Sequence, residues 1–348
     1  MAHAEVENRT PFAFQALFAA DEDGRPLLVP IVKGTFAIEP DGSVTVAEKQ
    51  MPVTFAGTCY GEPGLSSYKY EPEGAFTKSA TDVALIGAAH APTTGATEVY
   101  VRLCAGPLEK TIRVVGDRIW YRSLGMTVAT AAEPFETIPL TWEHAFGGWD
   151  RSHPDKENHA CEPRNPVGTG FRAKHGRFED GTRLPNLEDP RQPLRDYGGA
   201  ATPAGFGFTS PEWQPRASFG GTYDQKWADR RSPLLPTDFN RRFFSAAAPG
   251  LTAAGYFQGD ETVSVENASA RGTLTFHLPG TPPPVCRVQL PQRPDAVVET
   301  HLDTVIIDTD EHLLMVVWRG NLVLPGGPHD VSEIQIQAER VPAPAAAR

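Results

Sequence analysis

The chain has 348 residues, of which 40% are hydrophobic and 22% charged, the composition of a globular protein that can bury a full core. Its formal net charge of −11 at pH 7 repels phosphate backbones, so nucleic acid is not an expected partner. No apolar run approaches the roughly 20 residues of a membrane helix, and the first residues lack the pattern of a signal peptide. Four widely spaced cysteines fit reduced thiols, so we expect a cytoplasmic protein that contacts no membrane.

Residues 1–140 have the pattern of β structure, because polar and apolar side chains alternate and helical periodicity is scarce. The run 29–38 (VPIVKGTFAI) places Lys33 on the face of a strand opposite its large apolar side chains. Residues 111–121 (TIRVVGDRIWY) contain two strand-like runs around a Gly-Asp pair. This pattern predicts a hairpin.

Residues 141–250 are dense in glycine, proline, arginine and aromatic side chains. Prolines at this density exclude long helices and central strands, and the aromatic side chains argue against disorder. We expect long, ordered loops with two short helices, near 225–230 and 240–247. Asp224 and Asp238 precede these helices and are candidate N-caps.

Strand patterns return near residue 260. The run 304–318 (TVIIDTDEHLLMVVW) predicts a hairpin whose second strand is apolar on both faces, as in the centre of a sheet. We therefore expect a mainly β fold of antiparallel sheets, sandwich or barrel-like, with a long Gly/Pro/aromatic-rich loop region and few short helices. The expected organisation is one domain, 1–340, with inner parts 1–140, 141–250 and 251–340, and a loose tail, 341–348.

The run 141–155 (TWEHAFGGWDRSHPD) gathers aromatic, acidic and histidine side chains around two glycines. It admits three interpretations. A zinc site would use His144, His153, His159 and Cys161, but their spacing matches no usual zinc motif. We therefore expect no metal and no cofactor.

A hydrolytic centre is the second interpretation. Glu143 or Asp150 would orient a base such as His153. The sequence contains no GxSxG, HExxH or phosphate-loop motif that would supply a nucleophile, a metal or a phosphate cradle. We therefore expect a binding protein rather than an enzyme.

The third interpretation, which we favour, is architectural. The glycine pair lets the backbone turn sharply. Trp142 and Phe146 would then be buried, while Trp149, Asp150 and His153 would reach the surface.

A partner-binding surface is expected within 141–245, because aromatic and arginine side chains are enriched in protein interfaces. The candidate residues are Trp142, Glu143, Phe146, Trp149, Asp150, His153, Arg164, Trp213, Arg216, Tyr223, Asp224, Trp227, Arg242 and Phe243.

Short motifs follow one another in a fixed order from about residue 8 to 325. They include NRTPFAF (8–14), VKGTFAI (32–38), TDVALIGAAHAP (81–92), VVGDRIW (114–120), PFETIPLTWEHAFGG (134–148), NPVGTGF (165–171), LPNLEDP (184–190), PAGFGF (203–208), GTYDQKW (221–227), PLLPTDFNRRFFSAA (233–247), GDETVSVEN (259–267), LDTVIIDTD (302–310) and WRG (318–320). In their number and order the chain resembles the effector adaptor-chaperone family of the bacterial type VI secretion system. One departure is FTKSATDV (76–83), where similar proteins often carry a lysine-proline pair before TDV.

The resemblance implies a cytoplasmic, non-enzymatic protein that binds a toxic effector. Such a protein helps load the effector onto a spike made of a valine-glycine-repeat trimer and a PAAR tip protein. Two alternatives remain at this point. One is a hydrolase centred on Glu143, Asp150 and His153; the other is a carbohydrate-binding β module with a row of exposed tryptophans.

Overall fold

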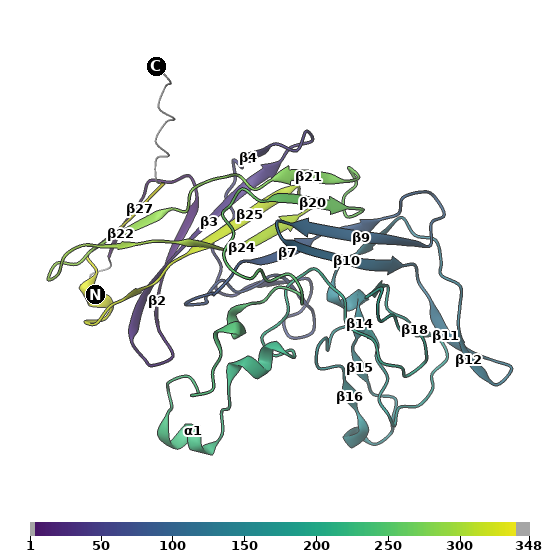
Figure 1. The fold of residues 1–348 in the computed structure, drawn as a ribbon. Helices are drawn as coiled ribbons and strands as arrows, with labels where there is room; N and C mark the ends of the chain where they lie inside the picture. Colours follow the sequence, from purple (N-terminus) through teal and green to yellow (C-terminus); the bar gives the residue numbers. More distant parts are fainter. Residues whose placement is uncertain (1–3, 339–348) are drawn as a thin grey trace.

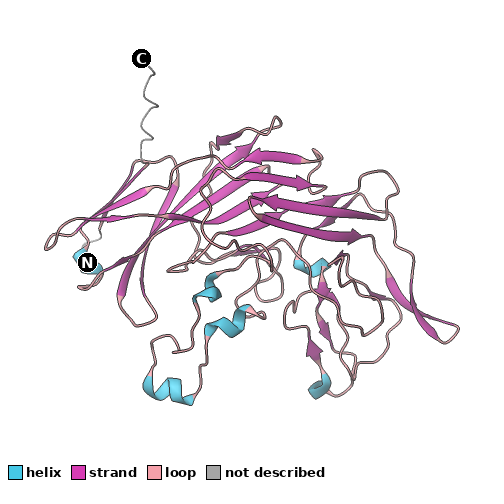
Figure 2. Ribbon diagram, viewed as in Figure 1, coloured by secondary structure: helices cyan, strands magenta, loops and turns pink. Residues whose placement is uncertain are grey.

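The computed structural model describes residues 4–338, and strands dominate it (Figures 1 and 2). The expected tail, 341–348, lies outside the described residues. The fold is mainly β, as predicted, and most strand pairs are antiparallel. Apolar side chains from the three largest sheets meet in one core cluster that includes Phe36, Val101 and Ile334. The larger sheets therefore pack as a sandwich.

A seven-stranded sheet forms the centre of the molecule. Its main path runs β2-β3-β25-β24-β7, and β4 and β26 also pair with β3. These strands are β2 (Ala13–Ala20), β3 (Pro26–Ile38), β4 (Val44–Val46), β7 (Asp82–Ile86), β24 (His301–Asp308), β25 (Leu313–Arg319) and β26 (Leu322–Val323). β24 and β25 form the predicted hairpin, and β25 lies between β24 and β3. This central position explains why both faces of β25 are apolar.

Two further sheets cover one face of the central sheet. The first runs β19-β10-β9-β20-β21 and the second β1-β27-β22-β23. Their strands are β1 (Glu5–Asn8), β9 (Glu98–Ala105), β10 (Leu108–Val115), β19 (Leu187–Glu188), β20 (Thr262–Glu266), β21 (Leu274–His277), β22 (Val285–Gln289), β23 (Ala296–Val298) and β27 (Glu333–Gln337).

Smaller elements decorate this core. The short strands are β5 (Thr58–Cys59), β6 (Tyr68–Tyr70), β8 (Ala88–His90), β11 (Ile119–Ser123), β12 (Met126–Ala129), β13 (Thr137–Pro139), β14 (Phe146–Gly147), β15 (Trp149–Asp150), β16 (Ala160–Cys161), β17 (Thr169–Gly170) and β18 (Thr182–Arg183). The helical elements are α1 (Gln225–Arg230) and five 3-10 turns, η1 (Trp142–His144), η2 (Lys156–Asn158), η3 (Arg216–Gly220), η4 (Arg241–Phe244) and η5 (Pro328–Asp330). None of the described helices has the length and apolarity needed to span a membrane.

The second face of the central sheet is covered by irregular chain. Ile306 and Met315 of this face pack against Phe208 and Ala246. The side chain of Lys33, which the alternation placed on the polar face of its strand, is buried here. Its ammonium lies 2.8 Å from the carboxylate of Glu73. Lys33 is therefore a buried ion-pair partner that attaches the irregular chain between β6 and β7 to the central sheet.

The hairpin predicted for 111–121 is wrong. β10 and β11 follow each other in the chain but belong to different sheets. The N–H of Gly116 donates to the carbonyl of Thr97, and a side chain at Gly116 would collide with the carbonyl oxygen of Glu133. The backbone near residue 133 therefore passes so close to Gly116 that only glycine fits there. This close approach, and not a tight turn, is the reason for the glycine.

The second predicted helix is shorter than 240–247. Only the 3-10 turn η4 forms, and Asn240 caps it by accepting the N–H of Arg242. Asp238 is not its cap, because the Asp238 carboxylate accepts hydrogen bonds from Thr222 instead. The first helix agrees with the prediction: Asp224 caps α1.

Candidate functional site

The run 141–155 is held in place by one buried side chain, Asn165. Its amide nitrogen donates to the carbonyl oxygens of Trp142 and Phe146 at 2.8 and 3.0 Å. Gly148 has a φ of +91°, and a Cβ there would lie 2.2 Å from a backbone oxygen of the neighbouring segment. Trp142 and Phe146 are buried, as expected. This turn is therefore an architectural bracket, in agreement with the favoured interpretation.

Asp150 departs from the expectation that it reaches the surface. Its side chain is buried and accepts hydrogen bonds from the N–H groups of Ser152 and Ala173. Burial alone would raise the pKa of Asp150, but these hydrogen bonds and the nearby Arg172 guanidinium hold the pKa below its usual value. The carboxylate is thus ionised and enclosed, and it anchors the loop that follows β15.

Glu143 and His153 also have local partners. The Glu143 carboxylate accepts the N–H and the hydroxyl of Ser67 at 2.7 and 2.8 Å. Nδ1 of His153 accepts the N–H of Asp155 at 3.0 Å. No hydrogen bond joins any two of Glu143, Asp150 and His153 in the described chain. This arrangement gives a hydrolytic centre no geometric support.

The side chains considered for zinc are likewise occupied elsewhere. The ring of His144 hydrogen-bonds to the Asn186 amide, and Nε2 of His159 hydrogen-bonds to the carbonyl of His153. Within residues 4–338, no three His, Cys, Asp or Glu side chains gather in a way that would hold a metal ion. A row of exposed tryptophans is also missing from this part of the chain, because four are buried: Trp120, Trp142, Trp213 and Trp318.

A buried ion cluster connects the loop region to the central sheet. The Lys78 ammonium lies 2.7 Å from the Glu71 carboxylate, 2.9 Å from Asp82 on β7 and 3.0 Å from the Thr304 hydroxyl. Asp82 also accepts the N–H of Ala246 at 2.9 Å. Burial alone would lower the pKa of Lys78, but the charges of Asp82 and Glu71 outweigh it and raise that pKa. Lys78 therefore stays charged between two carboxylates.

An arm formed by residues 217–244 extends below the sheets and carries α1 at its tip (Figure 1). The arm is fastened at its root by Arg216, whose Nε donates to the carbonyl of Phe243 at 2.8 Å. The Arg216 guanidinium also lies 3.7 Å from the carboxylate of Glu71. The root of the arm is thus linked to the buried ion cluster.

The outer part of the arm is fastened to the loop between β2 and β3. Arg231 donates to the carbonyl of Glu22 at 2.7 Å, and Arg241 pairs with the Glu22 carboxylate at 2.6 Å. Within the arm, the indole N–H of Trp227 donates to the carbonyl of Leu234 at 2.8 Å. The arm is therefore an ordered projection with contacts at both ends.

An apolar cavity of about 460 Å³ opens along the arm. Its lining includes Phe76, Tyr223, Leu234, Leu235, Phe239 and Phe243. The Phe239 and Phe243 rings meet edge to face with centroids 6.0 Å apart, and Tyr223 packs edge-on against Trp227 at 4.7 Å. Tyr223 is nevertheless 56% exposed. We call this cavity the arm groove.

Exposed cationic side chains also lie on the arm, and Lys226 and Arg230 line a cavity separate from the arm groove, together with Asp224 and Asp238. Lys226, Arg230 and Arg242 are exposed, and none of them forms a salt bridge with another residue of the described chain. The Arg242 guanidinium lies 4.3 Å from the centre of the Phe219 ring. The molecule as a whole has a charge of −11, so the arm is a local cationic region on an acidic protein.

The predicted binding residues divide into three groups. Buried side chains cannot contact a partner in this structure: Trp142, Phe146, Asp150, Trp213 and Arg216. Their internal contacts explain the correction, since Trp213 packs edge-on against Trp142 and Arg216 bonds backbone carbonyls. Residues on the arm are exposed or half-buried: Tyr223, Asp224, Trp227, Arg242 and Phe243. Others lie away from the arm and are also at least partly exposed: Glu143, Trp149, His153 and Arg164.

Only two residues of the groove wall, Tyr223 and Phe243, are predicted from the sequence. Phe76 comes from a distant segment, and Leu234, Leu235 and Phe239 lie between or just after prolines. The sequence signal that could have revealed these leucines is PLLP (233–236). It places two adjacent leucines between prolines, in a loop with no strand or helix to bury them.

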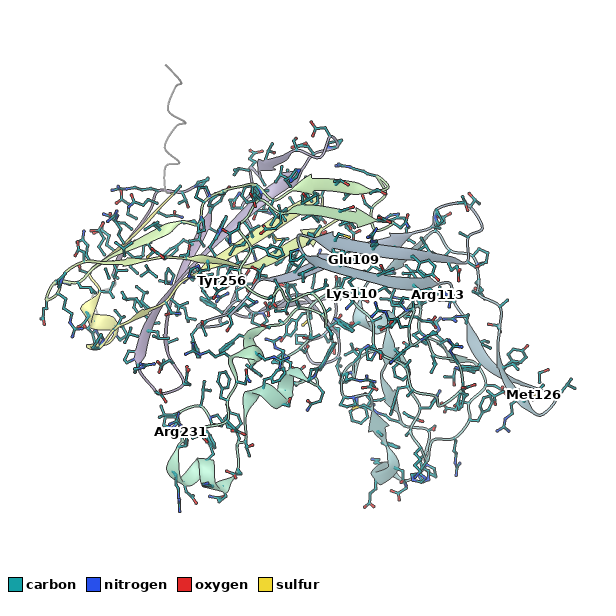
Figure 3. The ribbon with its side chains drawn as sticks, viewed as in Figure 1. Glu109, Lys110, Arg113, Met126, Arg231 and Tyr256 are labelled. Atoms are coloured by element: carbon teal, nitrogen blue, oxygen red, sulfur yellow. The ribbon has the colours of Figure 1, made fainter. Side chains whose placement is uncertain are left out.

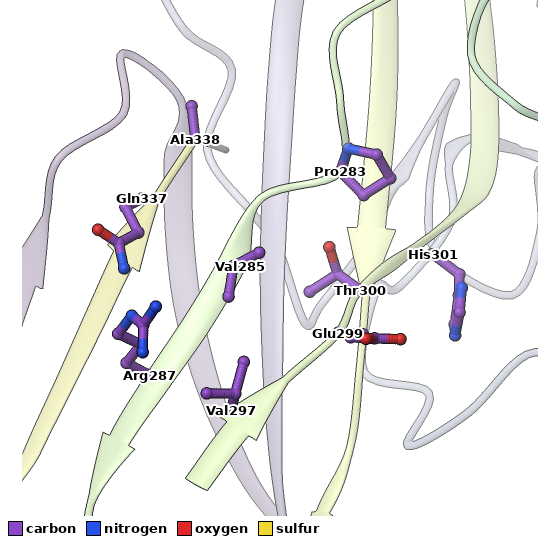
Figure 4. A pocket seen from close by; sticks show the side chains of 9 residues that line it. All are labelled: Pro283, Val285, Arg287, Val297, Glu299, Thr300, His301, Gln337 and Ala338. Atoms are coloured by element: carbon purple, nitrogen blue, oxygen red, sulfur yellow. The ribbon is translucent and has the colours of Figure 1, made fainter. Parts of the chain in front are cut away.

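Another cavity, of about 570 Å³, lies on the sheet that contains β22, β23 and β27 (Figure 4). Arg287, Val297, Glu299 and His301 are among the side chains that line it. None of the predicted binding residues contributes to this cavity. Two of the predicted aromatic residues, Tyr223 and Phe243, line the arm groove instead.

Comparison with protein families gives one match. The model of a family described as an uncharacterized protein conserved in bacteria (DUF2169) matches residues 23–319. Comparison with curated proteins and with solved structures gave no match.

We predict that Gly148→Ala lowers the free energy of unfolding by about 3 kcal/mol, because the added Cβ meets a backbone oxygen at a left-handed φ. Gly125→Ala is the control for the conformational part of this cost, since a Cβ at Gly125 meets nothing within 4 Å. Urea denaturation measures both variants. Equal losses of unfolding free energy in the two variants would contradict the architectural role that we assign to the turn at Gly148.

We predict that Lys78→Met lowers the free energy of unfolding by about 3–5 kcal/mol, because Glu71 and Asp82 lose their buried counter-charge. Lys226→Met is the matched control. Lys226 is exposed on α1, so its replacement should change stability by less than about 0.5 kcal/mol. Chemical denaturation of the three proteins tests this, and similar midpoints for Lys78→Met and wild type would be the contrary result.

Proposed function

We propose that this chain, which belongs to the family of conserved bacterial proteins called DUF2169, is an adaptor-chaperone of a type VI secretion system. In this proposal the protein acts by binding rather than by catalysis. It holds an effector, or the PAAR-containing part of one, in the cytoplasm. It then promotes loading of that effector onto the valine-glycine-repeat spike.

The observation that carries the proposal is the arm groove. Its exposed aromatic ring, Tyr223, stands beside apolar walls, and the same arm carries exposed cationic side chains; aromatic and arginine side chains are enriched in protein-binding hot spots. The ordered series of motifs from residue 8 to 325 supports the same role, because it resembles effector adaptors rather than any class of enzyme.

The chemistry of the arm defines the segment it would bind. An apolar side chain of the effector would enter the groove beside Phe239 and Phe243. Carboxylates that flank this side chain would meet Lys226, Arg230 and Arg242. We therefore propose an acidic segment with one or two large apolar residues as the docked part of the effector.

Adaptor function also requires release. Rim charges mainly affect the rate of association, whereas a desolvated aromatic contact controls dissociation. In our proposal the cations of the arm attract the effector and the groove retains it. Release would follow when the assembled spike offers the effector a larger interface.

The first test is purification of the tagged protein from its own host, followed by identification of what co-purifies. We expect a toxin-bearing effector or a PAAR protein at near-equal stoichiometry. Recovery of the protein without any effector, tip or spike component, under conditions in which the secretion system is made, would contradict the proposal.

The groove itself is tested with the co-purified partner. Tyr223→Ala should weaken binding by about 1.5–3 kcal/mol, the usual effect of removing an interface aromatic anchor. Tyr100→Ala is the matched control, because Tyr100 is similarly exposed but lies on β9 of the sandwich. Isothermal titration calorimetry compares the two, and equal affinities would exclude the arm groove as the docking site.

A further inference from the structure

A second projection, the hairpin of β11 and β12, lies away from the arm (Figure 1), with Met126 near its end (Figure 3). Its turn consists of Leu124 and Gly125, whose φ angles are +49° and +79°. Positive φ at both central positions is characteristic of the type I′ turn that closes tight hairpins. The hairpin is thus a regular, twisted β element.

The two faces of this hairpin are very different. On one face, Trp120 is buried and the Arg122 guanidinium lies 4.5 Å from the centre of the Phe178 ring, so this face packs on the body. On the other face, Ile119, Tyr121 and Met126 are exposed, Met126 to 62%. A strand that packs normally would place its apolar side chains inward and its polar ones outward. This hairpin therefore presents an apolar face to its surroundings.

Leu124 at the tip adds a second anomaly. Its side chain is 97% exposed, so it contributes almost nothing to the core. Its left-handed backbone conformation is one that leucine adopts at an energetic cost, whereas asparagine is the common residue at this turn position. Neither folding nor solubility benefits from leucine here, which points to a contact with another molecule.

The outer edge of β12 is also open. In the sheet order β12-β11-β18, β12 is an edge strand. Next to the turn, Ser123 pairs with Met126, so by alternation Thr127 and Ala129 direct their N–H and C=O groups outward. No backbone hydrogen bond reaches these groups from anywhere in residues 4–338.

Apart from its short length of four residues, this edge lacks the usual protection against pairing with another strand. Natural edge strands are very short, or carry lysine, proline, a bulge or a covering element. The run 123–132 (SLGMTVATAA) contains no charged residue and no proline, and the β11–β12 pairing has no bulge. The edge is therefore competent to receive a strand.

We propose that the β12 edge binds an extended, uncharged segment of a partner protein as an added β-strand, with Leu124 inserted into an apolar depression of that partner. The unpaired backbone groups specify an extended chain, because only a strand satisfies them in series. The edge strand itself carries no charged side chain, and the nearest charge, Arg122, lies on the neighbouring strand opposite Thr127. The uncharged edge strand favours a neutral segment rich in β-branched or aromatic residues. This binding mode is separate from the arm groove, for which we propose an acidic segment.

A second copy of this chain is a poorer occupant. Two four-residue strands paired edge to edge would bury far less than the roughly 1,200 Å² of a specific interface. Such pairing would also leave Leu124 of each copy beyond the end of the other strand. The longer strand of a different protein covers both the edge and the tip.

The probe is a displayed library of random peptides about ten residues long, the length of a long strand, selected against the full chain. We expect enrichment of uncharged peptides with alternating β-branched or aromatic residues. Thr127→Pro removes one outward N–H without breaking the β11–β12 ladder, and proline is tolerated on edge strands. Selected peptides should bind Thr127→Ala like wild type and Thr127→Pro with a Kd about tenfold higher.

Leu124→Asn provides an independent measurement if Thr127→Pro does not fold. Asparagine suits the turn, so the variant should be at least as stable as wild type. A ten-residue peptide extends past the four residues of β12, so peptides that reach the tip should lose an apolar contact with residue 124 and bind the variant more weakly. Circular dichroism and thermal unfolding check each variant. Three results would overturn the proposal: equal binding to Thr127→Pro and Thr127→Ala, failure to enrich uncharged peptides, or sedimentation of a dimer that Thr127→Pro abolishes, which would make a second copy the occupant.

Discussion

The buried Lys78 ammonium is the contact on which the functional part of the molecule depends. It lies between Glu71, in the irregular chain, and Asp82, on a strand of the central sheet. Removing the Lys78 charge would leave Asp82 without a salt-bridge partner and Glu71 with only the more distant Arg216 guanidinium, and an unpaired charge in a low-dielectric interior is costly. Arg216 extends the cluster to the root of the arm. The region richest in glycine and proline is therefore positioned by charge as well as by apolar packing.

The sandwich and the two projections have different roles in this account. The sandwich buries its apolar faces in one core. The surfaces to which we assign binding lie on the arm and on the β11–β12 hairpin, which need little packing of their own. The arm offers an apolar groove and carries exposed cationic side chains, whereas the β11–β12 hairpin offers an uncharged edge strand and an apolar tip. Under the function we propose, these two chemically different surfaces bind two different segments at once.

Local patterns in the sequence predict some of these features and miss others. The β24–β25 hairpin and the Asp224 cap of α1 follow from residues adjacent in the chain, so pattern and structure agree. The ion cluster was not predicted although Glu71 and Asp82 lie seven and four positions from Lys78, because nothing local requires a lysine to be buried. The β11–β12 turn was missed because a Leu-Gly pair is an unusual type I′ sequence, whereas the nearby Gly-Asp pair has a common turn composition. Among the predicted binding residues, those on the arm are exposed or half-buried. Outside the arm, Glu143, Trp149, His153 and Arg164 are also at least partly exposed, and the other five are buried.

Hydrogen–deuterium exchange of the full chain, alone and saturated with its co-purified partner, tests the central claim most directly. The account predicts slower exchange in residues 217–244 on binding, because the arm groove becomes covered, and unchanged exchange in 141–155, because that run is scaffold. Protection concentrated in 141–155, with the arm unaffected, would contradict the account and return attention to Trp149 and its neighbours as the binding surface.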